Sequence, residues 1–329
     1  MLNRISRLTF GFCFFHSLAI AQAIDNMASF RMIDAGKYVR LHYENDYFTS
    51  TDYYYTQGIN LEIVNPAYRR FPLSKLLFAP KNSTSQYGIS IEHNGYTPTS
   101  IRQNDILYGD RPFAAALLLK TFSTSSTDKH YRITSSLSLG VIGQAAGGRE
   151  MQTTIHRWIK DDAPLGWQHQ IQNDIIVNYE AGIEKTILQT ERHFIVNGLV
   201  QARAGTLDTR LSSGFVLFFG KLNSAITSVF SRNANGSPIN KSKSSLHLYA
   251  QPMIHAVAYN ATLGGGLFNR NSPYILLSKE IERLTYQGNY GLVFQNRSLY
   301  LEYFQSILSR EFKTGLYHRW GGIRMGVKW

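Results

Sequence analysis

The chain has 329 residues, a formal net charge of +12, one cysteine, 20 Tyr and 19 Phe. After its first 23 residues it contains no run of 18 apolar residues, which excludes a transmembrane helix from that part of the sequence. This composition is typical of a secreted soluble all-β protein or of a transmembrane β-barrel, whose strands each carry only a weak apolar signal.

Residues 1–23 have the pattern of a secretory signal peptide. Arg4 and Arg7 precede the apolar run LTFGFCFFHSLAIA, and the sequence AQA at 21–23 places small residues at both positions that direct cleavage. The apolar run has about 14 residues, fewer than the roughly 20 that a spanning helix needs. We expect cleavage after Ala23, which leaves a mature chain of net charge +10 without cysteine.

Alternation of apolar and polar residues with a period of two predicts twelve strands in the rest of the chain. Several are 11 to 15 residues long, whereas strands of soluble proteins have about 5–6 residues and tilted membrane-spanning strands about 9–11. In Tyr131–Ile142, one face suits lipid and the other a polar lumen. The predicted strands are Tyr38–Asn45, Tyr54–Val64, Gln86–Asn94, Phe113–Phe122, Tyr131–Ile142, Asp174–Thr186, His193–Gly205, Gly214–Gly220, Ser245–Tyr259, Tyr274–Tyr286, Tyr290–Ser306 and Thr314–Lys328.

An even number of strands fits a closed bacterial barrel, because open sheet edges cannot face hydrocarbon. The last strand ends on Trp329, and a terminal aromatic residue resembles the assembly signal of outer-membrane proteins. The predicted fold is therefore all-β: residues 24–329 form a single antiparallel transmembrane barrel of about 12 strands, with a short helix in an outward loop.

Strand parity, counted from an N-terminus in the periplasm, assigns each connection to one end of the barrel. The turn Gln287-Gly288-Asn289 is predicted to face inward. Residues 221–244 would form a long inward loop, which the pattern does not explain. The predicted outward connections are 46–53, 95–112, 143–173, 206–213, 260–273 and 307–313.

The outward connections contain three polar clusters. The first is Asn45-Asp46 with Thr51-Asp52, and the second is YGDRPFAAAL at 108–117. In the third, at 143–174, the segment EMQTTIHRWI has a helical pattern that places Gln152 and His156 four residues apart on one face. Asp-Asp-Ala-Pro at 161–164 ends this helix. Each cluster alone is also compatible with turn chemistry, a solvated ion pair or an ordinary packed histidine.

Several common hydrolase and metal signals do not occur in the sequence. It has no Gly-x-Ser-x-Gly elbow, and its ten histidines form no zinc-binding pattern. The remaining candidates for a functional site are carboxylate and amide oxygens near one histidine. Oxygen ligands suit a hard cation such as Ca²⁺, and a neutral imidazole beside such a cation can act as a base on water.

The motifs, taken in order, resemble those of the outer-membrane lipid A 3′-O-deacylases. They are Asn45-Asp46, YTxG at 55–58, GDRPFA at 109–114, and the segment at 140–170 that reads GVIG…AGGxExQxxxHR…WxxQ. The resemblance covers most of the mature N-terminal half; the C-terminal half resembles the family only as generic barrel strands. It implies a 12-stranded barrel that requires Ca²⁺ and hydrolyses the ester-linked acyl or acyloxyacyl chain at the 3′ position of lipid A.

The resemblance also implies roles for individual residues. His156 is expected to be the general base that activates water, with Gln152 orienting the base or the substrate. Asp46, with Asn45 beside it, belongs to the cation and oxyanion region, and Thr56 lines the site. Asp162 matches a position where the family can carry Glu, and is assigned to the metal together with Asp46. Arg102 corresponds to a family lysine near the substrate phosphates.

Lipid A is an anion with two phosphates, and basic side chains bind phosphate through charge-assisted hydrogen bonds. Four arginines of the outward connections are therefore expected to bind substrate, although each is also compatible with a role in surface charge. They are Arg102, Arg111, Arg149 and Arg157, near which Lys160 also lies.

The expected partners are lipid A or lipopolysaccharide and outer-membrane lipid, without nucleic acid, and the expected oligomeric state is a monomer. The expected location is the outer membrane of a Gram-negative cell, with the site facing the outer leaflet. Three alternatives remain at this point: a non-catalytic porin or adhesin, an outer-membrane phospholipase, and a secreted soluble β-protein.

Overall fold

The computed structural model describes residues 24–49, 51, 53–81, 83–127, 131–160, 162–190, 193–222, 226 and 244–329. The predicted signal peptide and most of the 221–244 segment lie outside these residues.

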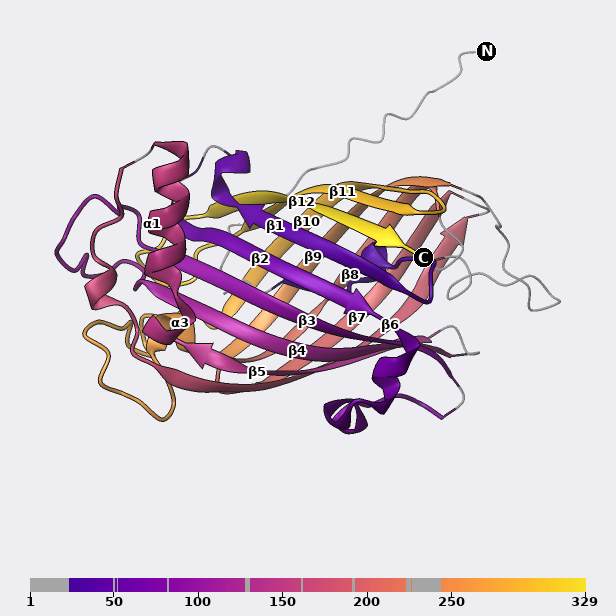
Figure 1. The fold of residues 1–329 in the computed structure, drawn as a ribbon, viewed down its shortest axis with the longest axis horizontal. Helices are drawn as coiled ribbons and strands as arrows, with labels where there is room; N and C mark the ends of the chain where they lie inside the picture. The colour runs from indigo at the N-terminus through magenta and orange to yellow at the C-terminus, as the bar shows by residue number, and fades with distance from the viewer. Residues whose placement is uncertain are drawn as a thin grey trace, which may run out of the picture.

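Twelve antiparallel strands of the described chain form one closed barrel, in which β12 pairs with β1 (Figure 1). This confirms the predicted fold class. The strands are β1 (Tyr38–Asn45), β2 (Tyr54–Val64), β3 (Ser83–Thr97), β4 (Ala114–Thr127), β5 (Tyr131–Ile142), β6 (Asp174–Thr190), β7 (Phe194–Gly205), β8 (Asp208–Lys221), β9 (Ser245–Asn260), β10 (Leu284–Gln295), β11 (Leu299–Leu308) and β12 (His318–Lys328).

Short helices occupy the connections and the N-terminal segment. They are η1 (Ser29–Arg31), η2 (Asp46–Thr49), η3 (Pro66–Arg70), η4 (Pro72–Leu76), η5 (Gln144–Ala146), α1 (Gly148–Ile159), η6 (Trp167–His169) and α3 (Ala261–Gly264). None of the described helices has the length and apolar character needed to cross a membrane.

The two predicted strands at Tyr274–Tyr286 and Tyr290–Ser306 are wrong in their bounds. Gln287-Gly288-Asn289 is not a turn but lies inside β10, where Gln287 is opposite Leu308 of β11 on one side and Met253 of β9 on the other. The actual turn is Asn296–Ser298, in which the Asn296 side chain accepts a hydrogen bond from the Ser298 backbone amide at 2.9 Å. Pairing with two neighbouring strands thus overrides the local turn propensity of Gln-Gly-Asn.

The barrel wall separates an apolar outer surface from a charged lumen. On β1, Leu41 is 44% exposed on the outside, whereas its neighbours Arg40 and His42 are buried within the barrel. Arg40 is paired in the lumen with Glu62 of β2 at 2.9 Å. The period-two pattern of the sequence is therefore the alternation between outside and inside.

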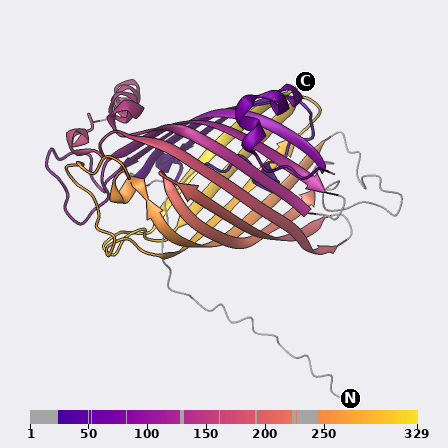
Figure 2. The ribbon, with the colours of Figure 1, turned by 90° about the horizontal axis from the view of Figure 1, so that it is seen from below.

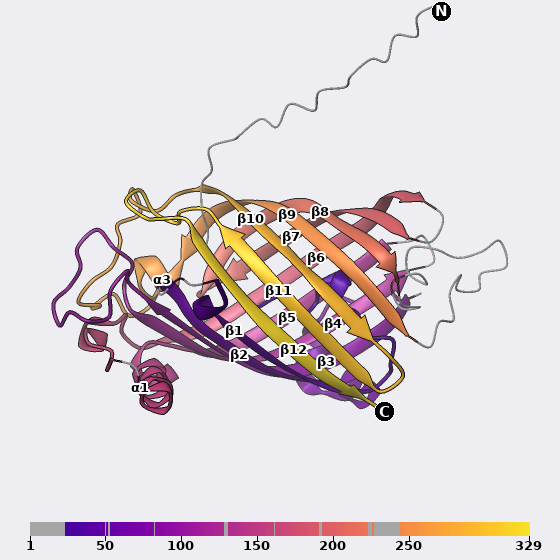
Figure 3. The same cartoon turned by 90° about the horizontal axis from the view of Figure 1, so that it is seen from above.

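The first described residues, Ile24–Ile33, lie within the lumen and are called here the N-terminal plug (Figure 3). Phe30 stacks on Tyr249 of β9 with the ring centroids 3.7 Å apart, and Arg31 pairs with Glu302 of β11 at 3.3 Å. Further contacts are Ser29 Oγ to Glu184 Oε1 (2.6 Å), Arg40 Nη1 to Arg31 O (2.8 Å) and Gln295 Nε2 to Met32 O (2.9 Å). The plug thus binds strands on several sides of the barrel.

Deletion of residues 24–33 should open the barrel to ions, because it removes the side chains that fill a lumen lined by charged groups. We expect discrete single-channel openings of the deletion variant in planar bilayers, and a silent wild-type barrel. Lys37→Gln, a change just beyond the plug, should also be silent. A deletion variant that retains the heat-modifiable mobility of a folded barrel but conducts no better than wild type would contradict this expectation.

The barrel has two different ends (Figure 1). The C-terminus and the short Asn296–Ser298 turn lie at one end, which is called here the terminus end. The long connections 98–113, 143–173 and 261–283 lie at the opposite end, which is called the loop end. Helix α1 stands at the loop end and contacts β4, so the predicted polar clusters of the outward connections meet at this end.

Candidate active site

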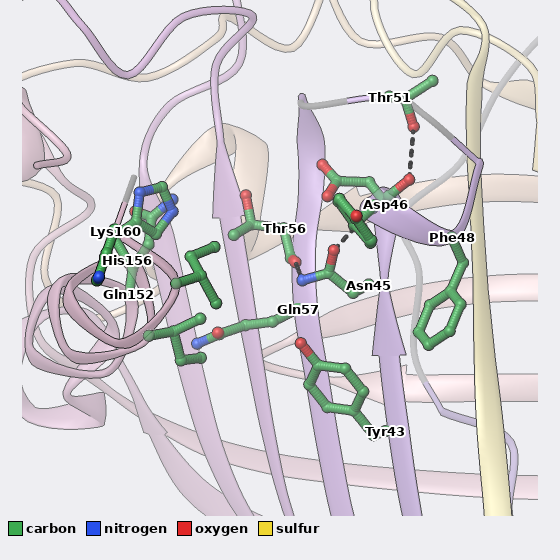
Figure 4. A pocket seen from close by; sticks show the side chains of 13 residues that line it. Tyr43, Asn45, Asp46, Phe48, Thr51, Thr56, Gln57, Gln152, His156 and Lys160 are labelled. Carbon is green, nitrogen blue, oxygen red and sulfur yellow. Dashed lines mark hydrogen bonds between the residues drawn. The ribbon is translucent and has the colours of Figure 1, made fainter. Parts of the chain in front are cut away.

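A cavity of about 710 Å³ lies at the loop end between η2, the adjoining ends of β1 and β2, and helix α1 (Figure 4). All five residues predicted to be catalytic line it. Its lining residues are Tyr43, Asn45, Asp46, Tyr47, Phe48, Thr51, Thr56, Gln57, Gln152, Ile155, His156, Ile159 and Lys160. The structure therefore brings together residues that are about 100 positions apart in the sequence.

Asn45 ties the end of β1 to β2. Its Nδ2 donates to the carbonyl oxygen of Thr56 at 2.7 Å, and its Oδ1 accepts from the Tyr47 backbone amide at 2.7 Å. Asp46 follows as the first residue of η2 and is buried, and its main-chain carbonyl accepts from Thr49 Oγ1 at 2.9 Å. These bonds fix the backbone from which the Asp46 carboxylate enters the cavity.

A β-bulge places Thr56 at the cavity. The register of β2 against β3 shifts between Tyr55 and Gln57, so Thr56 is an extra residue, and both Thr56 and Gln57 line the cavity. Bulges redirect side chains in this way at functional sites. Gly58 follows because a Cβ at this position would lie 2.0 Å from the Tyr55 hydroxyl.

Helix α1 presents its buried face to the barrel wall. This face carries Gly148, Gln152 and His156, spaced four residues apart as the sequence predicts. The helix packs closely, because a Cβ on Gly148 would lie 2.5 Å from the Ala115 Cβ and 2.6 Å from the Trp167 ring. This close approach holds the polar residues of the helix against the cavity.

The structure determines which nitrogen of His156 carries the proton. Nδ1 lies 2.6 Å from the main-chain oxygen of Asp162. A carbonyl oxygen can only accept, so Nδ1 donates and the lone pair resides on Nε2. His156 is thus held in the tautomer that a general base requires.

The Gln152 side chain is oriented by Trp167, which is not among the residues that line the cavity. Its Oε1 accepts a hydrogen bond from Trp167 Nε1 at 2.7 Å, and both side chains are buried. This bond fixes the amide plane and leaves Nε2 as a donor that has no partner among the described residues. Gln152 can therefore offer a hydrogen bond to a group in the cavity.

The oxygen atoms at the cavity are of the kind that a hard cation such as Ca²⁺ binds. Asp46 is the only carboxylate among the described lining residues, beside the hydroxyls of Thr51 and Thr56. The described residues contain no cluster of three or more His, Cys, Asp or Glu side chains that could hold a metal. A Ca²⁺ ion at Asp46 would therefore complete its six to eight oxygen ligands with hydroxyls, main-chain carbonyls, water or substrate.

Asp162 does not contribute its carboxylate to the cavity. The carboxylate pairs with Arg102 at 2.9 Å, and both side chains are exposed, 62% and 73%. Only the main-chain oxygen of Asp162 acts at the site, through His156. The structure therefore does not bring the Asp162 carboxylate to the cavity, and its expected role as a metal ligand stays a prediction.

Arg111 lies away from the cavity. Its guanidinium is buried, pairs with Glu311, and donates to Thr262 Oγ1 at 2.7 Å. It also stacks over the Tyr96 ring at 4.4 Å, and burial lowers the pKa of Arg111 to about 10. Arg111 therefore joins three parts of the loop end to one another, and the structure does not bring it to the cavity where substrate binding was expected.

The other predicted phosphate-binding arginines do not line the cavity either. Arg149 and Arg157 project from the exposed face of α1, and Arg102 is held by Asp162. The basic residue at the cavity is Lys160, which ends α1 in a left-handed backbone conformation and donates its amide to the His156 carbonyl.

Three residues of the site have no role assigned from the sequence. Tyr43 and Gln57 appear in the pattern only as parts of strands, and Gln57 has the outward direction of Leu61 because the register is regular between them. Trp167 falls within the third polar cluster, but its bond to Gln152 joins residues that no helical or strand period relates.

The similarity to known proteins concerns the family and the fold. The family model described as "Outer membrane protein LpxR" matches residues 8–329. A search of curated proteins found no match. Among solved structures, the chain is similar to LpxR from Salmonella typhimurium, with a TM-score of 0.72 and 20% identity over 89% of this chain and 100% of that chain.

A weaker similarity is to the beta domain of the Bordetella autotransporter Brka, with a TM-score of 0.45 and 8% identity over 90% of this chain and 100% of that chain. The similarity to the Salmonella protein supports the barrel fold, and the family match confirms the family predicted from the motifs. The chain therefore belongs to the LpxR family of outer-membrane proteins.

Proposed function

We propose that this protein is a Ca²⁺-dependent ester hydrolase that removes the 3′-linked acyl or acyloxyacyl chain from lipid A. The observation that carries the proposal is that His156, whose Nδ1 is bonded to the Asp162 carbonyl, lines one cavity with Asp46 and Thr56. Its membership in the family of outer-membrane proteins described above supports this assignment.

The position of the cavity on the wall supports a lipid substrate. Tyr43 and Gln57 lie on the outer faces of β1 and β2, the faces that also carry the exposed Leu41 and Leu61. An acyl chain could therefore enter the cavity sideways from the bilayer. Bacterial barrels place long loops outside the cell and short turns in the periplasm, so the loop end is assigned to the outer leaflet.

In the proposed reaction, His156 Nε2 accepts a proton from a water molecule while the water oxygen attacks the ester carbonyl carbon. The protonated ring then donates this proton to the departing 3′ oxygen, which gives a free fatty acid and a 3′-hydroxyl group. The Asp162 carbonyl keeps the ring in place throughout, and Gln152 Nε2 offers a hydrogen bond to the substrate.

Asp46 would hold Ca²⁺, with the nearby hydroxyls of Thr51 and Thr56. The ion, when bound, supplies positive charge that stabilises an oxyanion. Lys160, at the cavity rim, offers an ammonium group to the anionic headgroup of the substrate.

The mass spectrum of lipid A from Gram-negative cells with and without the gene tests the proposal. We expect cells that express the protein to lose the mass of the 3′ acyl or acyloxyacyl group. An unchanged lipid A spectrum with folded protein in the outer membrane would contradict it. Fatty acid released from glycerophospholipids instead would identify a phospholipase.

A further inference from the structure

The connection between β2 and β3 folds back over the outside of the barrel (Figure 2). Residues 65–81 of this connection, which contain η3 and η4, are called here the wall flap. It lies at the terminus end, at the opposite end of the barrel from the cavity. By comparison, the turn Asn296–Ser298 at the same end has three residues.

Apolar side chains attach the wall flap to the outer surface. Leu77 packs in a buried cluster with Tyr87 of β3 and Leu137 of β5, and Leu73 and Tyr179 lie against that cluster. The flap backbone also bonds to the wall: the Phe78 amide donates to the Tyr179 hydroxyl at 3.1 Å, and this hydroxyl donates to the Leu76 carbonyl at 3.2 Å. The flap is thus part of the wall.

The wall beneath the flap is polar where lipid would otherwise touch it. Thr121, Ser123 and Ser135 have the outward direction of Leu119 and Leu137, yet each is at most 1% exposed. Ser74 Oγ of the flap lies 3.1 Å from Thr121 Oγ1, and Ser135 Oγ donates to the Phe78 carbonyl at 3.0 Å. Contact between these hydroxyls and hydrocarbon would raise the free energy of the folded barrel, and the flap prevents that contact.

The outer surface of the flap is basic and apolar at once. Leu76 and Phe78 are 61% and 58% exposed. No acidic residue occurs between positions 65 and 81. Four exposed cations accompany the two apolar side chains, and none of them forms an ion pair with another described residue. They are Arg69, Arg70, Lys75 and Lys81.

We propose that the wall flap binds the headgroup of an anionic glycerophospholipid in the periplasmic leaflet of the outer membrane. Exposed apolar side chains beside several cations are typical of segments that lie in a membrane interface. Leu76 and Phe78 enter the acyl region, and the cations of η3 and η4 contact the lipid phosphate. This site is separate from the cavity and independent of the proposed hydrolysis.

The test compares Arg69→Gln/Arg70→Gln/Lys75→Gln with wild type by native mass spectrometry of the intact barrel in detergent. The probes are dioleoyl phosphatidylglycerol and dioleoyl phosphatidylcholine. A basic residue near an anionic membrane surface is worth about 1 kcal/mol, or about fivefold in affinity. We expect wild type to prefer phosphatidylglycerol and the triple variant to bind it at least about tenfold more weakly.

The matched control is Lys37→Gln/Arg297→Gln, which removes two exposed cations at the same end of the barrel but outside the flap. It should bind phosphatidylglycerol like wild type. Equal binding of the two lipids by wild type would overturn the proposal, as would full binding of phosphatidylglycerol by the triple variant. Heat-modifiable mobility of each variant checks that the barrel is folded.

A photoreactive side chain identifies the occupant in cells. With Leu76→p-benzoylphenylalanine, we expect a lipid adduct after irradiation of outer membranes. A protein adduct in its place would show that the flap is a docking surface for a periplasmic protein, and would overturn the assignment to lipid.

Discussion

His156→Ala should leave the barrel folded and lower the rate of acyl release by at least about 100-fold, the lower range for the loss of a general base. The expected loss follows from the geometry: His156 is the only imidazole among the described residues that line the cavity, and its Nδ1 bond to the Asp162 carbonyl fixes the ring there. The measurement is the rate of fatty-acid release from purified lipid A in detergent micelles.

The control for this variant is Trp158→Ala, which lies on the same helix but is 78% exposed and does not line the cavity. It should retain acyl release within about twofold, since surface substitutions usually have small effects. Release by His156→Ala at the wild-type rate would refute the role of His156 as general base, whatever the protein hydrolyses.

The second large effect is expected at Asp46. Asp46→Asn keeps the size of the side chain but removes the carboxylate charge at the cavity, so it should lower acyl release by about 100-fold or more, as loss of electrostatic stabilisation does in other hydrolases. It should also abolish the increase in thermal stability that added Ca²⁺ gives to wild type, because a ligand that binds the folded state stabilises it.

Asp105→Asn, an exposed carboxylate in the 98–113 connection, is the matched control and should keep both responses. Wild type in excess chelator should lose acyl release and regain it when Ca²⁺ is restored. Full release in the chelator would refute the dependence on Ca²⁺ but not the role of His156, so the two parts of the mechanism can be tested separately.

The sequence predicts the barrel and the shared helical face of two site residues, because both depend on residue periodicity within one segment. The bounds of β1, β2 and β5 are correct, since their alternation is regular and their ends are marked by polar residues. Gln152 and His156 fall on one face for the same reason. The tertiary position of α1 beside Asp46 came from the family resemblance, because no period relates these segments.

The features that the sequence does not reveal depend on contacts between distant segments. Arg111 has the sequence features of a surface cation, and its burial depends on Glu311, 200 residues away. The bulge at Thr56 depends on the register of β3, and the wall flap depends on a polar surface formed by β4 and β5. In each case the residue that makes the contact is too far away in the sequence for a local pattern to reveal it.

The N-terminal plug has a consequence for the order of folding. Its partners are late in the chain: Ser29 and Glu184 are separated by 155 residues, and Arg31 and Glu302 by 271. Contacts of such separation form slowly, because the intervening chain must first be ordered. The plug is translated before the strands that hold it, so its docking has to wait until β11 is in place. The beginning of the chain is therefore among the last parts of the barrel to reach its final position.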